Sequence, residues 1–479
     1  NTALGHGALS ANTTASENTA VGRASSQLNT TGTANVAVGF KSLNANTEAN
    51  QNTAIGADAL RTSTTAGSNT AIGHDALCAT TTGGQNNAFG DGAMDANTTG
   101  CRNVSIGNGS MTKNTEGICN TAIGHITLQC NLTGDLITAV GAQALHKNTA
   151  DKNTAVGSCA GFSHTTGVNF VAIGHNAGYS NTTASANTFV GTSSGFKNTT
   201  GANNTALGAN AGMCNETSAN NTAVGTDSLR KNTGASNTAI GSNSLACNTT
   251  GANNVAVGAS AMDANTEGYD TVVMGVEALT VATTANTNVA VGRQAMCKTT
   301  TGTNNVAVGA FAMCGNSTSG NNTAVGAYAL RESTTTDLNV ALGFSALCAK
   351  TNLGNDNTAI GACSQSKNTE GYYNTSVGKS SLVNVTTGDN NIALGRDSGN
   401  DAMINITTED NRLVVGNNSI SNSYVKVDWT VTSDLRDKTN FGEVPHSLDF
   451  VNQLEPVSFQ FKKSRDDDTP TGKVRYGFK

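Results

Sequence analysis

The stretch Asn1-Thr2-Ala3-Leu4-Gly5 opens the chain, and its pattern decides the fold because it recurs along most of the sequence. The glycine of this pattern occurs 25 times, from Gly5 to Gly416, and 20 of the 24 intervals between successive copies equal 17, as between Gly5 and Gly22. The other intervals equal 16, 16, 18 and 21. A fixed period of this kind predicts a repeat architecture in which each repeat forms one unit of a stack.

The columns of the repeat, numbered from this glycine as position 0, indicate the local structure. The residue at −1 is apolar in all 25 copies, the residue at −3 is Thr in 14 and Val in 8, and the residue at −4 is Asn in 21. Position +3 is always Ala, Ser or Thr, position +4 is usually Leu or Met, and a turn cluster such as Asn97-Thr98-Thr99-Gly100 follows. Period-two alternation of β-branched residues predicts a short strand before the glycine, and we expect a second short strand after it.

These columns predict an all-β fold, a parallel β-solenoid or β-roll of about 25 coils with one 17-residue repeat per coil. Coils stacked at the inter-strand distance of about 4.8 Å would form a rod of roughly 120 Å. We expect the apolar −1 column and the Leu/Met +4 column to fill the interior. The −4 asparagines are expected to form a ladder of amide hydrogen bonds, and the small +3 residues to allow close backbone approach, including approach by other chains.

The composition suits a thin, repetitive body and excludes several classes of protein. The 479 residues include 54 Gly but only 3 Pro, with 4% aromatic and 13% charged residues. An ordinary enzyme of this length would need bulkier core residues, a disordered chain more Pro and charge, and collagen a Gly at every third position. The net charge of −6 attracts neither nucleic acid nor an anionic membrane, and no run of 18 apolar residues is present for membrane insertion. The 11 Cys include no CxxC pair, which argues against a zinc site or a disulfide framework.

A core this narrow is energetically marginal within one chain. Three chains around a common axis would bury a second surface, so we expect a homotrimeric fibre. The repeat resembles the heads of trimeric autotransporter adhesins, which are left-handed parallel β-rolls, although the repeats of those heads are shorter than the present one. It is also similar to the repeat shafts of viral fibre proteins. The resemblance covers residues 1 to about 416 and implies a β-solenoid repeat shaft over 1–416.

The C-terminal part of the chain has a different composition. All three Pro and the single Trp429 lie after residue 417, which indicates a connector over 417–432 and the start of a small α+β domain over 433–479. We expect a strand at Val457–Phe461, a short helix at Leu448–Leu454 and a solvated loop at Asp466–Asp468.

A recognisable motif begins at Ser433. It comprises Ser433-Asp434-Leu435-Arg436-Asp437-Lys438, Asn440-Phe441, Leu448, Leu454-Glu455-Pro456-Val457-Ser458-Phe459 and Tyr476-Gly477-Phe478. This motif resembles the opening of the endosialidase-type intramolecular chaperone domain, a family that caps trimeric viral fibres, assists their trimerisation and often cleaves itself off. The resemblance implies that the domain is incomplete at Lys479, where the family would continue.

The same resemblance implies a site of self-cleavage. Ser433 would be the nucleophile, Lys438 its general base, and the bond between Thr432 and Ser433 the one that is cut. The chemistry is reasonable, because a Ser hydroxyl needs a base and a Lys can serve if burial lowers its pKa. The alternative is that Ser433 and Asp434 cap a turn and Lys438 is solvated.

Other candidate sites lie in the repeat region. The +1 histidines are three or four coils apart, so they could share a metal ion only across the chains of a trimer; otherwise they are surface residues, and we assign no metal and no cofactor. These histidines are His6, His74, His125 and His175. Cys297 and Cys314 occupy the +5 column of successive coils, within disulfide range, but small buried thiols are the favoured interpretation.

Receptor or glycan contacts are expected in the turns, where the sequence varies most. The candidate segments are Lys147 to Lys152, Phe162 to His164, and Tyr372-Tyr373. The stacked Thr of the −3 column also suggests an ice-binding face, but free exchange of Thr with Val argues against it, because a buried wall tolerates that exchange better.

Together these features predict a structural virion fibre, either a tail fibre or a surface fibre, that attaches to a host-cell receptor or glycan. It would be extracellular or on the virion surface, joined to virion or tail proteins through a missing N-terminal part, and its only enzymatic activity would be single-turnover self-cleavage. A bacterial trimeric surface adhesin head is the alternative, but it predicts a coiled-coil stalk and a membrane barrel after the head. An ice-binding or glycan-active solenoid is a further alternative.

Overall fold

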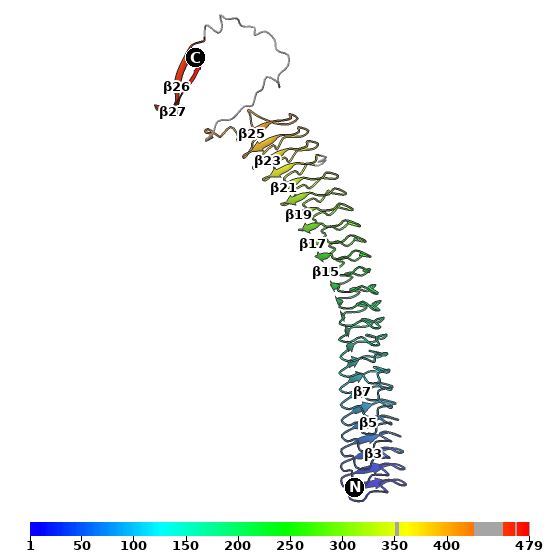
Figure 1. Cartoon of the computed structure of the whole chain (residues 1–479). Coiled ribbons are helices and arrows are strands. Elements are labelled where there is room, and N and C mark those ends of the chain that lie inside the picture. The colour runs from blue at the N-terminus through cyan, green and yellow to red at the C-terminus, as the bar shows by residue number, and fades with distance from the viewer. Residues whose placement is uncertain (350–353, 426–453, 465–466, 479) are drawn as a thin grey trace. The chain divides into compact units, whose positions relative to one another are not determined.

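The computed structural model describes residues 1–349, 354–425, 454–464 and 467–478. They fall into two compact units, Asn1–Ile420 and Ser421–Lys479. The first unit confirms the predicted fold: it is a parallel β-solenoid of about 24 turns, with one three-residue strand in each coil (Figure 1). None of the described residues is helical.

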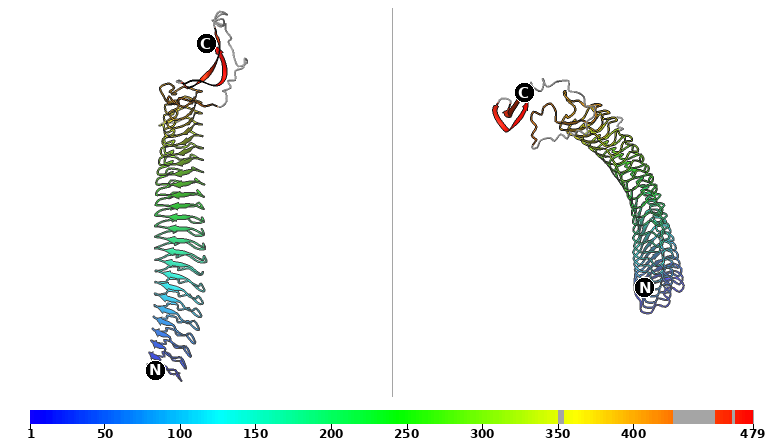
Figure 2. Two further views of the ribbon diagram at one scale, coloured as in Figure 1. Left: turned by 90° about the vertical axis from the view of Figure 1, so that its left-hand side faces the viewer. Right: turned by 45° about the horizontal axis from the view of Figure 1, so that its top comes forward.

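The strands of the solenoid recur once per repeat. They are β1 Thr2–Leu4, β2 Thr19–Val21, β3 Val36–Val38, β4 Thr53–Ile55, β5 Thr70–Ile72, β6 Asn87–Phe89, β7 Val104–Ile106, β8 Thr121–Ile123, β9 Thr138–Val140, β10 Thr154–Val156, β11 Val171–Ile173, β12 Thr188–Val190, β13 Thr205–Leu207, β14 Thr222–Val224, β15 Thr238–Ile240, β16 Val255–Val257, β17 Val272–Met274, β18 Val289–Val291, β19 Val306–Val308, β20 Thr323–Val325, β21 Val340–Leu342, β22 Thr358–Ile360, β23 Thr375–Val377, β24 Ile392–Leu394 and β25 Leu413–Val415. Each strand pairs in parallel and in register with that of the next coil, so that Thr53 lies beside Thr70 and Ile55 beside Ile72. The strand arrows consequently line up along one side of the solenoid as a single 25-stranded sheet (Figure 2).

The repeat glycine turns the chain after each strand, and only glycine fits there. Gly56 has a φ of +137°, a conformation that residues with a side chain rarely adopt. A Cβ at this position would also lie 2.3 Å from the carbonyl oxygen of Gly73 in the next coil. Both the turn and the close stacking of coils therefore require glycine in this column.

The prediction of a second strand after the glycine is wrong. This segment is a turn in which φ is positive at +2 and +4, as at Asp58 (57°) and Leu60 (51°). Its backbone still bonds to both neighbouring coils, because Asp58 N–H donates to the Phe40 carbonyl at 2.9 Å and Leu60 N–H to the Ala76 carbonyl at 3.0 Å. The alternating sign of φ removes the strand geometry while the buried backbone groups keep their partners.

The interior of each coil is lined mainly by small side chains. Ala54 at −2, Ala59 at +3 and Leu60 at +4 have no exposed surface. The prediction for the +4 column is thus confirmed, and the +3 column packs inside its own chain. The prediction for the −1 column is wrong, because Ile55 points out of the coil and is 38% exposed. Side chains alternate along a strand, so only one of −2 and −1 can face inward, and the narrow coil takes Ala.

Two asparagine columns border this interior. The N–H of Asn52 donates to Asn35 Oδ1 at 2.9 Å, and Asn52 Nδ2 donates to the Ala66 carbonyl at 2.9 Å. The predicted −4 ladder therefore exists, but it joins side-chain amides mainly to the backbone, with amide-to-amide bonds from Asn103 to Asn86 at 3.2 Å and from Asn322 to Asn305 at 3.3 Å. Amide-to-amide bonds occur in a second column at +7, where Asn46 Nδ2 donates to Asn29 Oδ1 at 2.7 Å. These bonds satisfy buried polar groups that a thin coil cannot expose to water.

Four successive coils have glycine at +4 in place of Leu or Met. Two buried rings fill the space in the first three of these coils: Phe170 stands where −4 is usually Asn, and Phe189 where −2 is usually Ala, with ring centroids 5.9 Å apart. A Cβ on Gly195 would lie 2.6 Å from the Phe189 ring, and a Cβ on Gly178 would lie 2.5 Å from the Phe170 ring. In these three coils, side-chain volume lost at +4 is replaced by a ring at −4 or −2. The four glycines are Gly161, Gly178, Gly195 and Gly212.

The described part of the second unit is an antiparallel pair, β26 (Pro456–Ser464) and β27 (Asp467–Phe478). It confirms the strand predicted at Val457–Phe461. The loop predicted at Asp466–Asp468 is wrong in part, because β27 already begins at Asp467. The helix predicted at Leu448–Leu454 lies outside the described residues except for Leu454. In the described parts of the chain, no helix has the length and apolar character needed to span a bilayer.

Candidate functional site

The predicted self-cleavage site, Ser433 with Lys438 and the bond after Thr432, lies outside the described residues. The structure thus does not test these roles, which stay predictions.

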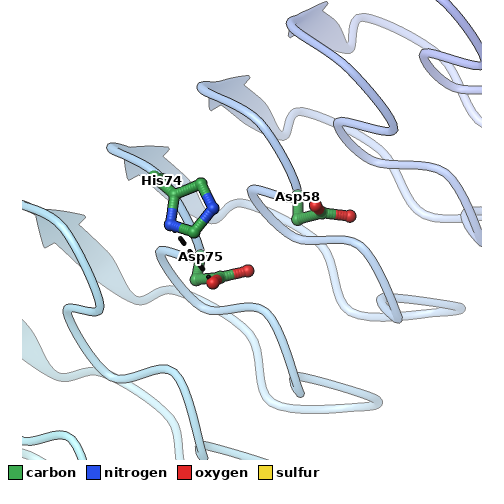
Figure 3. A group of neighbouring side chains, drawn as sticks. All are labelled: Asp58, His74 and Asp75. Carbon is green, nitrogen blue, oxygen red and sulfur yellow. Dashed lines mark ion pairs between the residues drawn. The ribbon is translucent and has the colours of Figure 1, made fainter.

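His74 has acidic neighbours that the sequence analysis missed. Its Nδ1 lies 3.2 Å from Asp75 Oδ2 and 3.2 Å from Asp91 Oδ1 in the next coil. Figure 3 shows His74, Asp75 and Asp58 side by side at the turns that follow successive strands. The available signal was the spacing, since Asp58 and Asp75 share the +2 column one repeat apart, and Asp91 stands one repeat after His74 in the +1 column.

This cluster has the side chains of a cation site but is explained by ion pairs. Ligand atoms of Asp58, His74 and Asp75 all lie within 4.8 Å of one another. However, Asp58 Oδ1 also accepts from Arg61 Nη1 at 3.4 Å, and the His74 side chain is 60% exposed. Exposed pairs of this kind contribute little stability and arise without a ligand. We therefore assign no metal to the cluster.

The turn at Phe162, predicted as a receptor contact, belongs to a ladder of stacked rings. Rings in the +5 column of four coils stack with centroids 5.1 to 5.3 Å apart, and Lys147 Nζ lies 5.4 Å from the Phe162 centroid. The rings are those of His146, Phe162, Tyr179 and Phe196. They are half-buried, and successive rings cover one another's faces. The main effect of the ladder is to add ring-on-ring contacts between neighbouring coils, although the edges of the rings remain at the surface.

A second group of rings lies further along the solenoid. Phe311 and Tyr328 stack at 5.3 Å, while Phe344 meets Tyr328 edge to face at 5.9 Å. The guanidinium of Arg331 lies 5.3 Å from the Tyr328 centroid. Phe344 is the exposed member, at 54%. The predicted Tyr372-Tyr373 turn is also exposed, with ring centroids 6.3 Å apart. These surfaces are candidates for contact with a receptor or glycan.

His164, predicted to lie in an exposed turn, is instead fully buried. Its Nε2 lies 2.8 Å from the Gly167 carbonyl, so this nitrogen carries the proton and donates, and its ring stacks on Phe170 at 4.5 Å. Burial lowers the pKa of His164 to about 4. His164 occupies the +7 column where asparagine is usual, beside a Phe that replaces another asparagine, so it is a core residue rather than a contact residue.

Cys297 and Cys314 form a disulfide in the structure, with Cα atoms 4.8 Å apart. The favoured prediction of free thiols is wrong for this pair, because the in-register stacking of coils places the +5 residues of neighbouring repeats at bonding distance.

Comparison with known families identifies the C-terminal part of the chain. Residues 433–479 match the peptidase S74 family, described as the chaperone of endosialidase. No curated protein and no solved structure matches the chain. The matched range contains β26, β27 and the Ser433–Lys438 motif, while the solenoid lies outside it.

Proposed function

We propose that this protein is a structural virion fibre, a tail fibre or surface fibre, whose β-solenoid is the shaft. The observation that carries the proposal is the combination, in one chain, of a solenoid of about 24 turns with an endosialidase-chaperone part after it. Chaperones of this family generally act on trimeric fibres, so a homotrimer is the assembly that we propose. The fibre would extend from the virion surface, or lie outside the cell, and attach to the host.

The shaft chemistry supports a structural role. Its coils are held by inter-coil backbone bonds and buried amide ladders, as at Asn35 and Asn52, which make a long, regular body. In this proposal, virion or tail proteins are bound at one part of the fibre, and a host receptor or glycan is contacted by exposed turns such as Tyr372-Tyr373.

Self-cleavage before Ser433 forms part of the proposal. Lys438 would remove the proton from the Ser433 hydroxyl, whose oxygen would attack the Thr432 carbonyl carbon. The C–N bond between Thr432 and Ser433 would then break, with the proton passing from Lys438 to the freed Ser433 amine, and an ester would join Thr432 to the Ser433 oxygen. Hydrolysis of this ester by water would leave a Thr432 carboxylate and the Ser433 hydroxyl, which releases the two chain parts. The mass of purified wild-type chain, of Ser433→Ala and of the control Ser458→Ala tests this step. Wild type and Ser458→Ala should be cut after Thr432, whereas Ser433→Ala should keep the full 48.4 kDa. Equal masses for all three would contradict self-cleavage but not the fibre.

The fibre itself is tested by assembly and shape. Light scattering should give about three times the mass of one chain, whether that chain is the uncut 48.4 kDa precursor or the shaft released by self-cleavage. Electron microscopy should show rods. A stable monomer would contradict the homotrimer. The adhesin-head alternative is not favoured, because the chain continues after the last solenoid strand, Leu413–Val415, into a chaperone match that begins at residue 433.

A further inference from the structure

The outer face of the solenoid sheet carries an unbroken apolar column at −1, beside a −3 column of mixed Thr and aliphatic residues. Its residues are the −3 and −1 side chains of β1–β25, which point away from the coil interior. We call this surface the outer sheet face. The −1 residues Ile55, Ile123 and Ile240 are 38%, 36% and 41% exposed, and Leu207 is 48% exposed. Aliphatic side chains are thus presented to solvent in coil after coil.

No charged residue interrupts this face. The 25 strands contribute two outward residues each, and none is Asp, Glu, Lys or Arg. Residues 1–416 hold 42 of the 60 charged residues, about 10% of their positions, so a surface of 50 positions would carry about five by chance. The charges of the solenoid lie instead in the turns, as do Asp58 and Arg61.

The outer sheet face is large enough to form a stable interface between proteins. Exposed apolar patches on monomeric proteins reach about 300–600 Å². The outer sheet face is three residues wide, about 10 Å, and its 25 strands stacked about 4.8 Å apart span roughly 115 Å, which gives a face of roughly 1,100 Å². This exceeds the roughly 800 Å² that each partner contributes to a standard stable interface. A surface of this extent, if left in water, would promote association without control.

We propose that the outer sheet face is the surface through which copies of this chain assemble side by side, with the −1 column at its centre. The inference deepens the proposed fibre and rests on it for the number of copies. A second copy fits because it carries the same repeat, so parallel chains in register match coil by coil along the whole sheet. In that arrangement Phe89, a ring among aliphatic neighbours, lies near Phe89 of the other copies.

Charge placed on the face tests the proposal. Ile240 and Val257 are −1 residues of neighbouring coils, and Ile240→Glu with Val257→Glu introduces two carboxylates where copies would meet. Thr250→Glu is the matched control, since Thr250 is exposed in the far turn of the same repeat. Because the wild-type side chains already contact solvent, each chain should still fold, as circular dichroism can verify.

The expected result is a shift of the double variant to monomers at concentrations where wild type and Thr250→Glu stay assembled, with at least a tenfold rise in the dissociation constant measured by analytical ultracentrifugation. If the double variant assembles like the wild type, the face proposal is overturned while the fibre proposal stands. A wild-type monomer would overturn both. Ice-recrystallisation inhibition by such a monomer, lost in Ile240→Glu, would identify ice as the occupant instead.

A photo-reactive benzoylphenylalanine at position 89 provides a second measurement without added charge. Cross-links between position 89 and residues 87–89 of another copy support the parallel arrangement, and the same probe at Thr99, in the far turn, should give none. Cross-links from position 89 to strands near the opposite end would support the face but overturn the parallel, in-register arrangement.

Discussion

The exchange of core volume between Phe189 and Gly195 gives a sharp test of how a coil is packed. Most coils pair a small −2 residue with a large +4 residue, as with Ala290 and Met296. The coil of β12 reverses this, with Phe at −2 and Gly at +4. We predict that Phe189→Ala and Gly195→Leu each destabilise the solenoid, and that the double variant recovers more than half of the loss.

The magnitudes follow from the contacts. Phe189 is 2% exposed, and truncating a buried Phe to Ala costs about 3–5 kcal/mol. Gly195→Leu would place its Cβ 2.6 Å from the Phe189 ring, and such overpacking costs about 1–3 kcal/mol or more. Backbone strain is not the obstacle, because φ is 56° at Gly195 and 51° at Leu60 in the same column. Recovery is incomplete because the Phe189 ring also fills space beside Gly178.

Gly212→Leu is the control, because Gly212 has a φ of +58° but faces only Ala206 Cβ, at 3.6 Å. This variant should be neutral or stabilising. Calorimetric unfolding and hydrogen exchange of the β12 coil measure the effects, since a solenoid is stabilised mainly between neighbouring repeats. The packing argument is refuted if Gly195→Leu is as stable as Gly212→Leu, or if the effects of the two single changes simply add in the double variant.

Gly56→Ala should lower stability by about 2 kcal/mol or more, because its φ of +137° and the contact with the Gly73 carbonyl both oppose a Cβ; an unchanged thermal midpoint would contradict this. The pKa of His164 is lowered to about 4 in the folded state, against about 6.5 when unfolded. The unfolded state therefore binds the proton first, and up to about 3 kcal/mol of stability is lost as pH falls from 6.5 to 4. Hydrogen exchange should show this loss in wild type and not in His164→Asn. Cys297→Ser should cost up to about 3 kcal/mol without reductant and little with it, because the bond to Cys314 closes a 17-residue loop; equal losses in both conditions would argue against the disulfide.

The period of the repeat was sufficient to predict the solenoid, the glycine turns and the buried +4 column, because stacking constrains every coil in the same way. It could not show which strand face is inside. Alternation assigns Ala54 and Ile55 to opposite faces, and a rule that places bulky apolar residues inward selects Ile55. The coil instead admits only the smaller residue, and the near-uniform Ala of the −2 column was the signal for this.

Site residues were less predictable, because inter-coil neighbours depend on register. His74 meets Asp91 one repeat later, which becomes evident only when columns are compared between coils. His164 looked like a turn residue, but the neighbouring Phe170 shows that this coil has a rearranged core. Ser433 and Lys438 were assigned from the family pattern, and their arrangement lies outside the described residues.

The outward position of the −1 column changes the physical reason for expecting assembly. A thin core shared by three chains was inferred while Ile55 and its equivalents were assigned to the interior. With these residues outside, the interior consists of Ala, single Leu or Met side chains and amide ladders, and so one chain buries even less aliphatic surface by folding. The missing apolar burial lies on the outer sheet face, where only contact between molecules can remove it from water. The outward position of the −1 residues thus makes a single chain less stable on its own, and it provides the surface that would stabilise an assembly of copies.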